Sequence, residues 1–221
     1  MKLLLPVLLL ATACASSKMS PDPCGPTMDQ KSVREVFGPI ISYMEIRDGD
    51  SFADVGASGG GLTIMMSSLM TNNVIYVQDI DSACLNEAKV WNLVEYYSKQ
   101  CHRDLANANK YKTVIGTVHK TNLPIAGIDK IYSNATFHQF SDVDGMLTDI
   151  YNTLKPDGSV FFRDSFSDKE EVEYCTDKAK CGLPLTKTAD FLRAMERNGF
   201  VLVKSQEFFG YPIYKFTKAL H

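Results

Sequence analysis

The chain has 221 residues, of which 45% are hydrophobic and 22% are charged. These proportions are those of a folded globular protein, and the length suits one domain with a substantial core. The net charge is −3 and the pI is near 5.8, and the sequence contains no run of Lys or Arg. A nucleic-acid partner is therefore not expected.

Residues 1–15 have the features of an export signal. One Lys precedes the apolar stretch Leu3–Leu10, and small residues follow it. This stretch is too short to span a bilayer as a mature helix. The residues before Cys14 resemble a bacterial lipobox, although Ala11 stands where Leu is usual. The resemblance implies lipidation of Cys14, attachment to the membrane and a place in the bacterial cell envelope facing the periplasm. Cleavage after Ala13 or Ala15, giving a soluble secreted protein, and an uncleaved N-terminus are the alternatives.

Export would place the remaining cysteines in an oxidising compartment, where paired cysteines become disulfides. Cys175 and Cys181 lie six residues apart in a polar segment and could close a small loop there, or could remain two unpaired thiols. The Cys and His residues lack the spacing of a metal site, so no metal is predicted.

Residues 16–30 are polar and contain three prolines, which predicts a tether. The folded domain is then expected to comprise residues 31–221. Apolar residues at helical spacing predict a helix over Val33–Met44, broken or kinked at Gly38 and Pro39.

The stretch "FADVGASGGG" at residues 52–61 is the most informative part of the sequence. An apolar strand end is followed by an acid, a glycine-rich turn and then a helix over Leu62–Met70. Bare backbone of this kind indicates close approach to a ligand or a turn with positive φ. A flexible linker is the alternative, but the flanking apolar segments disfavour it. α/β proteins hold nucleotide-like ligands with this arrangement.

The rest of the chain alternates between strand and helix patterns. Asp81 or Ser82 is expected to cap the helix after the second strand, and Thr186 or Thr188 the last helix. Five β/α alternations closed by a hairpin predict an α/β fold with a mainly parallel seven-stranded sheet and helices on both faces. Further strands are predicted at 73–79, 112–118, 129–135, 159–165, 200–209 and 211–220; helices at 81–97, 142–154 and 189–198; and a turn at 155–158.

The pattern Asp54-x-Gly56-x-Ser58-x-Gly60 is similar to the glycine motif of class I S-adenosylmethionine-dependent methyltransferases, with Ser58 in place of the middle glycine. Asp79, 23 residues after Gly56, matches the acid that holds the ribose hydroxyls in that family. "SNATFHQF" and "LKPDGSVFFRD" also resemble family segments. The likeness covers about residues 33–220 and implies a single Rossmann-like methyltransferase domain.

The resemblance implies S-adenosyl-L-methionine as cofactor and a small-molecule acceptor. Backbone N–H groups of residues 56–61 are expected to receive the carboxylate of the cofactor, and Asp79 its ribose hydroxyls. Asp54 could instead only pin the loop, and Asp79 only cap the next helix. Thr117 stands where the family often has an acid near the adenine. The expected cofactor-binding residues are Asp54, Gly56, Ala57, Ser58, Gly60, Asp79, Ile80, Thr117 and Asn134.

Methyl transfer from a sulfonium depends largely on positioning, so few catalytic side chains are required. His138 is the candidate base, and a structural histidine is the alternative. Residues 167–187 are expected to form a lid over the acceptor pocket.

Three functions remain open at this point. The first is an exported or envelope-anchored methyltransferase that acts on a small-molecule or lipid-like acceptor. The second is a non-catalytic ligand-binding lipoprotein with the same fold. The third is an NAD-dependent oxidoreductase, because Gly56, Ser58 and Gly61 distantly resemble a dinucleotide-binding pattern; the preceding Asp54 and the serine count against it.

Overall fold

The computed structural model describes residues 22, 24, 25, 27–173 and 183–219. The proposed lipidation site Cys14 and the proposed disulfide between Cys175 and Cys181 lie outside the described residues. In the part of the chain that is described, no helix is both long and apolar enough to cross a membrane.

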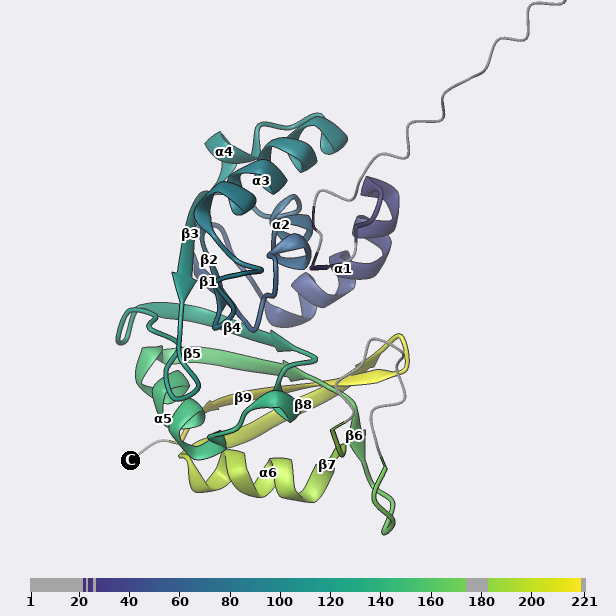
Figure 1. Ribbon diagram of the computed structural model, residues 1–221, viewed down its shortest axis with the longest axis vertical. Helices are drawn as coiled ribbons and strands as arrows, with labels where there is room; N and C mark the ends of the chain where they lie inside the picture. Colours follow the sequence, from purple (N-terminus) through teal and green to yellow (C-terminus); the bar gives the residue numbers. More distant parts are fainter. Residues whose placement is uncertain (1–21, 23, 26, 174–182, 220–221) are drawn as a thin grey trace, which may run out of the picture.

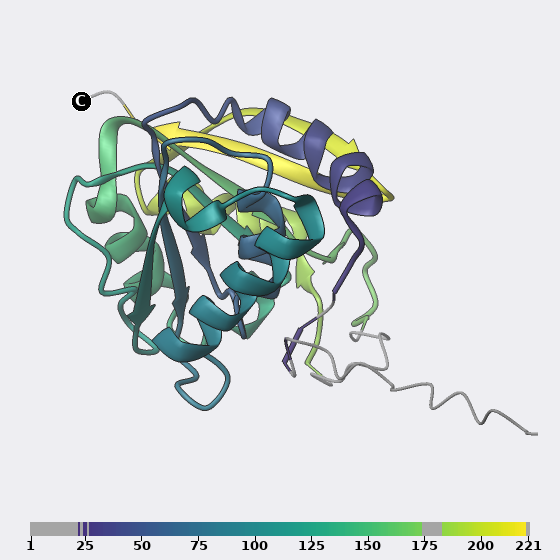
Figure 2. The ribbon, with the colours of Figure 1, turned by 90° about the horizontal axis from the view of Figure 1, so that it is seen from above.

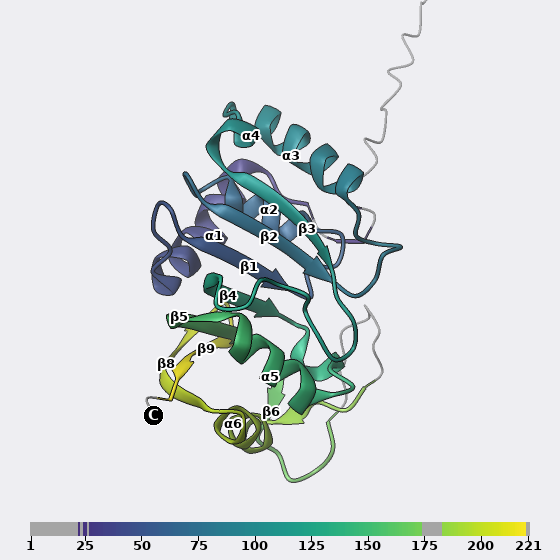
Figure 3. The same cartoon turned by 90° about the vertical axis from the view of Figure 1, so that its left-hand side faces the viewer.

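A seven-stranded sheet forms the centre of the molecule, with the strand order β3-β2-β1-β4-β5-β9-β8. Figure 3 shows β3, β2, β1, β4 and β5 side by side in this order. These five strands are parallel, whereas β9 runs antiparallel to both β5 and β8. The predicted fold class and C-terminal hairpin are thereby confirmed. The strands are β1 (Ser51–Val55), β2 (Val74–Asp79), β3 (Lys110–Ile115), β4 (Ile128–Asn134), β5 (Leu154–Arg163), β8 (Phe200–Phe208) and β9 (Tyr211–Lys218).

Helices cover both faces of the sheet (Figure 1). Both faces need a cover because the apolar side chains of a strand such as β1 alternate between the two faces of the sheet. Phe52 packs into the core under α1–α3, whereas Ala53 and Val55 pack into the core under α5 and α6. The helices are α1 (Gln30–Met44), α2 (Gly61–Ser67), α3 (Glu87–Cys101), α4 (Leu105–Ala108), α5 (Val143–Thr153) and α6 (Thr188–Arg197), with a short 3-10 helix η1 (Phe137–Gln139) and a small parallel pair, β6 (Phe166–Ser167) and β7 (Thr186–Lys187).

Helix α1 is attached to the C-terminal hairpin. Figure 2 shows the purple helix beside the yellow strands. The Tyr43 hydroxyl donates to the Ile213 carbonyl oxygen (3.1 Å), and Glu45 pairs with Lys215 (2.9 Å) and Lys204 (3.0 Å). Elements from the two ends of the described chain are thus held together on one side of the molecule.

Several predicted boundaries change. Helix α1 continues through Pro39 without a break, because the apolar stripe on either side of it is buried against the core and outweighs the lost hydrogen bond. Helix α3 begins only at Glu87, capped by Asn86, whose side chain accepts from the Lys89 N–H (3.0 Å). Asp81 instead accepts from the Ala83 N–H (2.8 Å) in the preceding turn.

Other corrections concern α6 and two strands. Lys187 is the N-cap of α6 and makes no side-chain capping bond, so neither Thr186 nor Thr188 caps this helix. The third strand ends at Ile115 because residues 117–120 form a turn. The predicted turn at 155–158 is a bulge within β5, since the pairing passes from Ile128–Leu154 to Lys130–Ser159.

The described part of the predicted tether belongs to the folded domain. Asp29 caps α1 by accepting from the N–H groups of Lys31 (2.9 Å) and Ser32 (3.1 Å). Asp22 is only 3% exposed. The tether prediction is therefore wrong for these residues, because their polar side chains bind backbone N–H groups of the domain.

Candidate functional site

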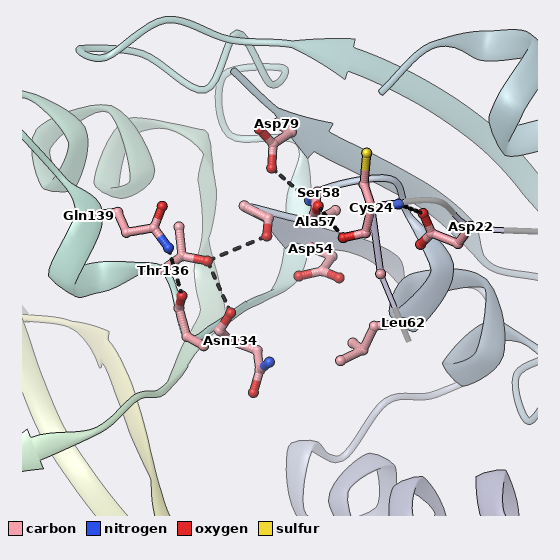
Figure 4. A pocket seen from close by; sticks show the side chains of 13 residues that line it. Asp22, Cys24, Asp54, Ala57, Ser58, Leu62, Asp79, Asn134, Thr136 and Gln139 are labelled. Carbon is pink, nitrogen blue, oxygen red and sulfur yellow. Dashed lines mark hydrogen bonds between the residues drawn. The ribbon is translucent and has the colours of Figure 1, made fainter. Parts of the chain in front are cut away.

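A pocket of about 300 Å³ opens at the carboxyl ends of β1, β2 and β4 (Figure 4). Strand β1 lies between β2 and β4, so the strand order reverses direction at this point. Open α/β sheets bind ligands at such a switch point. The lining residues are Asp22, Cys24, Gly25, Asp54, Gly56, Ala57, Ser58, Leu62, Asp79, Asn134, Ala135, Thr136 and Gln139.

The glycine-rich loop turns sharply beside the pocket. Gly56 has a φ of +83°, and a Cβ there would lie 2.2 Å from the Thr136 side chain. Gly60 has a φ of +90°, and its Cβ would lie 2.9 Å from Val77. Both positions therefore require glycine for backbone conformation and for space. Gly60 lies where the loop packs against Val77 of β2, and it does not line the pocket.

The N–H groups of the loop are largely used within the chain. Those of residues 56 and 57 donate to the Gln78 carbonyl oxygen (3.0 and 2.9 Å), and that of Gly60 donates to the Ala57 carbonyl oxygen (2.9 Å). Ser58 donates to Asp79 Oδ2 (2.6 Å), and Gly61 donates to Asp22 Oδ2 (2.9 Å). The expectation that these five N–H groups receive a cofactor carboxylate is therefore not met.

Asp54 is a buried acid among the residues that line the pocket. Its Oδ2 accepts from the Thr63 hydroxyl (2.6 Å), whereas Oδ1 has no hydrogen-bond partner among the described residues. Burial raises the pKa of Asp54 to about 7; the Thr63 hydrogen bond opposes this effect, and the negative charge of Asp79 adds to it. Asp54 does not pin the loop by that bond, since its partner lies on α2.

Asp79 links the loop to the turn after β2. Its Oδ2 accepts from the Ser58 N–H (2.6 Å) and its Oδ1 from the Asp81 N–H (2.8 Å). It caps this turn and not helix α3, which begins at Glu87. Each carboxylate oxygen can accept a further hydrogen bond, so Asp79 retains the capacity to bind ligand hydroxyls.

Asn134 enters the pocket from the end of β4. Its Oδ1 accepts from the Tyr132 hydroxyl (3.2 Å) and from Arg163 Nη1 (3.0 Å). The Arg163 guanidinium also lies 5.0 Å from the centre of the Tyr211 ring. Because its oxygen already accepts these two bonds, the NH₂ group of Asn134 is the part of the amide that remains available to a ligand, as a donor.

The electrostatic character of the pocket is acidic. Asp22, Asp54 and Asp79 line it, and the described lining residues include no Lys, Arg or His. A positively charged ligand group suits such a wall, whereas a diphosphate would meet three carboxylates.

A second cavity of about 90 Å³ adjoins the first and shares Gly56, Thr136 and Gln139 with it. Ile80 lies here, and so does Val118. Its apolar lining suits a flat ring. Thr117 lines neither cavity. Its hydroxyl oxygen is used within the turn, where it accepts from the N–H groups of residues 119 and 120 (3.2 and 3.1 Å).

His138 is not among the residues that line either cavity. Its Nδ1 lies 2.8 Å from Asp164 Oδ1, and the two side chains are only 8% and 2% exposed. The Asp164 carboxylate also accepts from the His138 backbone N–H (3.1 Å). This geometry favours the structural role that the sequence left open.

Sequence reasoning missed part of the pocket wall. Asp22, Cys24 and Gly25 line it although they fall in the predicted tether, and Cys24 forms a disulfide with Cys84, 60 residues away. No local pattern indicates this pairing. Thr136 and Gln139 lie after the fourth strand, in the segment "SNATFHQF" that resembles a family segment, and this resemblance was the signal that could have indicated them.

Comparison with known proteins identifies the domain. Residues 53–162 match the family model described as "Methyltransferase domain". A sterol 24-C-methyltransferase of Pneumocystis carinii is 25% identical over 178 residues. The match covers 76% of this chain but only 44% of that protein, so the chain spans less than half of this curated relative.

Solved structures show the same fold. An S-adenosylmethionine-dependent methyltransferase of Aquifex aeolicus has a TM-score of 0.60 at 15% identity, covering 88% of this chain and 100% of that one. One from Methanosarcina mazei has a TM-score of 0.61 at 12% identity, with 83% and 98% covered. The cyclase SpnF has a TM-score of 0.63 at 12% identity, with 90% of each chain covered. The chain therefore has the class I methyltransferase fold, and S-adenosylmethionine is the cofactor that this fold and the family match imply.

Proposed function

We propose that this protein transfers a methyl group from S-adenosylmethionine to a small-molecule or lipid-like acceptor. The observation that carries the proposal is the buried Asp54 Oδ1, which has no described partner and lies in an acid-lined pocket at the switch point of the sheet. A buried carboxylate of this kind is costly unless a ligand pairs with it. The cofactor brings a cationic amino group and a sulfonium to such a site.

The residues present fit the parts of this cofactor. Asp54 would pair with the ammonium group of its methionine portion, and Asp79 would accept from the ribose hydroxyls. The Asn134 NH₂ group would donate to the carboxylate, in place of the loop N–H groups. The apolar cavity beside Ile80 and Val118 would take the adenine.

When bound, the cofactor supplies an electrophilic methyl group on a positively charged sulfur. The chain contributes mainly position and electrostatics. The rigid glycine loop and the fixed Asn134 amide set where the ligand lies, and the carboxylates stabilise its positive charge before transfer. We assign no proton-transfer step to His138, because its side chain is largely buried and lines neither cavity.

A lipid-like acceptor is supported by the relative from Pneumocystis carinii, whose name states that it methylates a sterol. We also propose that the protein is exported and anchored in the bacterial envelope through Cys14. The disulfide between Cys24 and Cys84 supports export, since disulfides persist in oxidising compartments.

Calorimetry on the purified protein with S-adenosylmethionine, S-adenosylhomocysteine and NAD tests the proposal. Binding of the first two, with release of S-adenosylhomocysteine when a panel of lipid and small-molecule acceptors is added, is the expected result. Binding without turnover on any acceptor would favour the ligand-binding lipoprotein. Binding of NAD instead would favour an oxidoreductase, and no affinity for S-adenosylmethionine would overturn the proposal.

Two glycines provide a matched pair of variants. Gly56 and Gly49 both have positive φ (+83° and +93°), so alanine strains the backbone at each. Only at Gly56 does the added Cβ meet another residue, Thr136, at the pocket; nothing lies within 4 Å at Gly49. We expect Gly56→Ala to weaken S-adenosylmethionine binding by at least about tenfold, and Gly49→Ala to lower stability without changing affinity. Equal affinities of the two folded variants would contradict this role for Gly56.

A further inference from the structure

A short segment before α1 forms one wall of the pocket. We call residues 22, 24 and 25 the strap; all three line the pocket, and Figure 4 shows Asp22 and Cys24 there. Asp22 Oδ2 accepts from the Gly61 N–H (2.9 Å), and its Oδ1 accepts from the Cys24 N–H (2.9 Å). The Ser58 hydroxyl donates to the Cys24 carbonyl oxygen (3.0 Å). The strap is therefore bound along the glycine-rich loop.

The disulfide fixes the strap from the other side. Cys84 lies in the turn between β2 and α3, five residues after Asp79, and its bond to Cys24 ties the strap to that turn. One covalent link thus joins the strap to the segment that carries Asp79.

The loop sequence is adapted to the strap. A Cβ at Gly59 would lie 2.2 Å from the Asp22 carboxylate, and a Cβ at Gly61 would lie 2.3 Å from it. Ser58 takes a positive φ of 53°, which a serine adopts at some cost. Its hydroxyl bonds to the strap, a contact that glycine at this position would lack. Contact with the strap therefore explains three features of the loop: the glycines at positions 59 and 61, and the serine at position 58 where the family motif has glycine.

We propose that the strap is a positioning element of the cofactor site and that the Cys24–Cys84 disulfide holds it there, so that affinity for S-adenosylmethionine depends on the oxidation state of this pair. The inference rests on the proposed function. With the disulfide formed, Asp22 is fixed as part of the acidic wall and the loop is pre-organised. With the disulfide reduced, the strap loses its covalent link to the turn after β2 and keeps its noncovalent contacts, so it leaves the pocket wall more often.

The redox step needs a dithiol reductant. One of its thiolates attacks a sulfur of the Cys24–Cys84 bond, and the mixed disulfide resolves to the cyclic disulfide of the reductant and two protein thiols. Two electrons and two protons pass to the protein in this exchange, and a disulfide oxidant reverses it.

The test compares the oxidised protein, the same protein reduced with dithiothreitol, and the double variant Cys24→Ser/Cys84→Ser. We expect calorimetry to show about tenfold weaker S-adenosylmethionine binding for the reduced protein and the double variant, with unchanged circular dichroism. Cys101→Ser, which alters the free thiol at the end of α3, is the matched control and should retain the affinity of the oxidised protein. Asp22→Asn, which keeps the disulfide, should show a smaller loss.

A second readout makes the inference independent of ligand binding. Hydrogen exchange of the Gly61 amide, which donates to Asp22, should become faster on reduction. If the oxidised protein binds no S-adenosylmethionine, the proposed function fails, whereas the exchange experiment still tests the strap. Equal affinities in the oxidised, reduced and double-variant proteins would overturn the positioning role, and an unchanged exchange rate at Gly61 would overturn the role of the disulfide in holding the strap.

Discussion

Asp54 combines two properties that conflict unless a ligand pairs with it. It is almost completely buried, and one of its oxygens has no partner among the described residues. Burial raises its pKa from 3.8 to about 7. The native state therefore keeps a proton that the unfolded chain loses between these values, so ionisation of Asp54 lowers stability as pH rises through this range.

The same property makes cofactor binding depend on pH. We expect the affinity for S-adenosylmethionine to rise between pH about 6 and about 7.5, because the ionised Asp54 is the form that attracts the cationic ligand. Asp54→Asn should bind more weakly and lose this pH dependence, yet the unliganded variant should gain stability relative to wild type as pH rises. Calorimetry and thermal unfolding across this range measure both effects. An identical pH profile in wild type and variant would exclude Asp54 as the titrating group.

At the scale of single elements, α1 shows how packing overrides local preference. Gly38 and Pro39 both disfavour a helix, but the helix continues through them because Val33, Phe37, Ile40 and Met44 are buried on one side. Gly38 and Pro39 thus lower the intrinsic helix propensity of α1, and the tertiary contacts of its buried side chains compensate for this loss.

Gly38→Ala should consequently stabilise the protein. Nothing lies within 4 Å of a Cβ at Gly38, and its φ is not positive, so alanine adds helix propensity without a clash. We expect a gain of about 1 kcal/mol in the free energy of unfolding, measured by urea denaturation. Gly49→Ala is the control with the opposite sign, because its φ is +93°. Destabilisation by Gly38→Ala would mean that glycine is required there for a reason outside the helix.

At the scale of the whole molecule, the Cys24–Cys84 disulfide and the proposed N-terminal signal favour the same environment. A pocket whose wall depends on a disulfide suits a protein that folds outside the reducing cytosol. The cofactor is made in the cytosol, so an exported methyltransferase would need S-adenosylmethionine to reach its compartment.

The proposed anchor is tested on the full-length chain expressed in a bacterium. If Cys14 is lipidated, the protein partitions into the detergent phase, and Cys14→Ser releases it as a soluble or unprocessed form. Cys101→Ser should partition like wild type. Recovery of wild type in a wash without detergent would refute the anchor.

The sequence by itself determined the elements and their class. Periodicity of apolar residues depends on neighbours a few positions apart, so the strands, the helices and the glycine turn are visible locally. Alternation of strand and helix then implies a parallel sheet. The acids Asp54 and Asp79 could be placed beside the pocket because each lies at the carboxyl end of a parallel strand, at the same edge of the sheet.

Only the tertiary structure decided which groups meet across the chain. Cys24 and Cys84 are 60 residues apart, and His138 in η1 meets Asp164, which lies just after β5. The N–H groups of the glycine loop look available in sequence, but Asp22, Gln78 and Asp79 already bind them. Such pairings depend on how distant segments pack in three dimensions, and local spacing does not encode that.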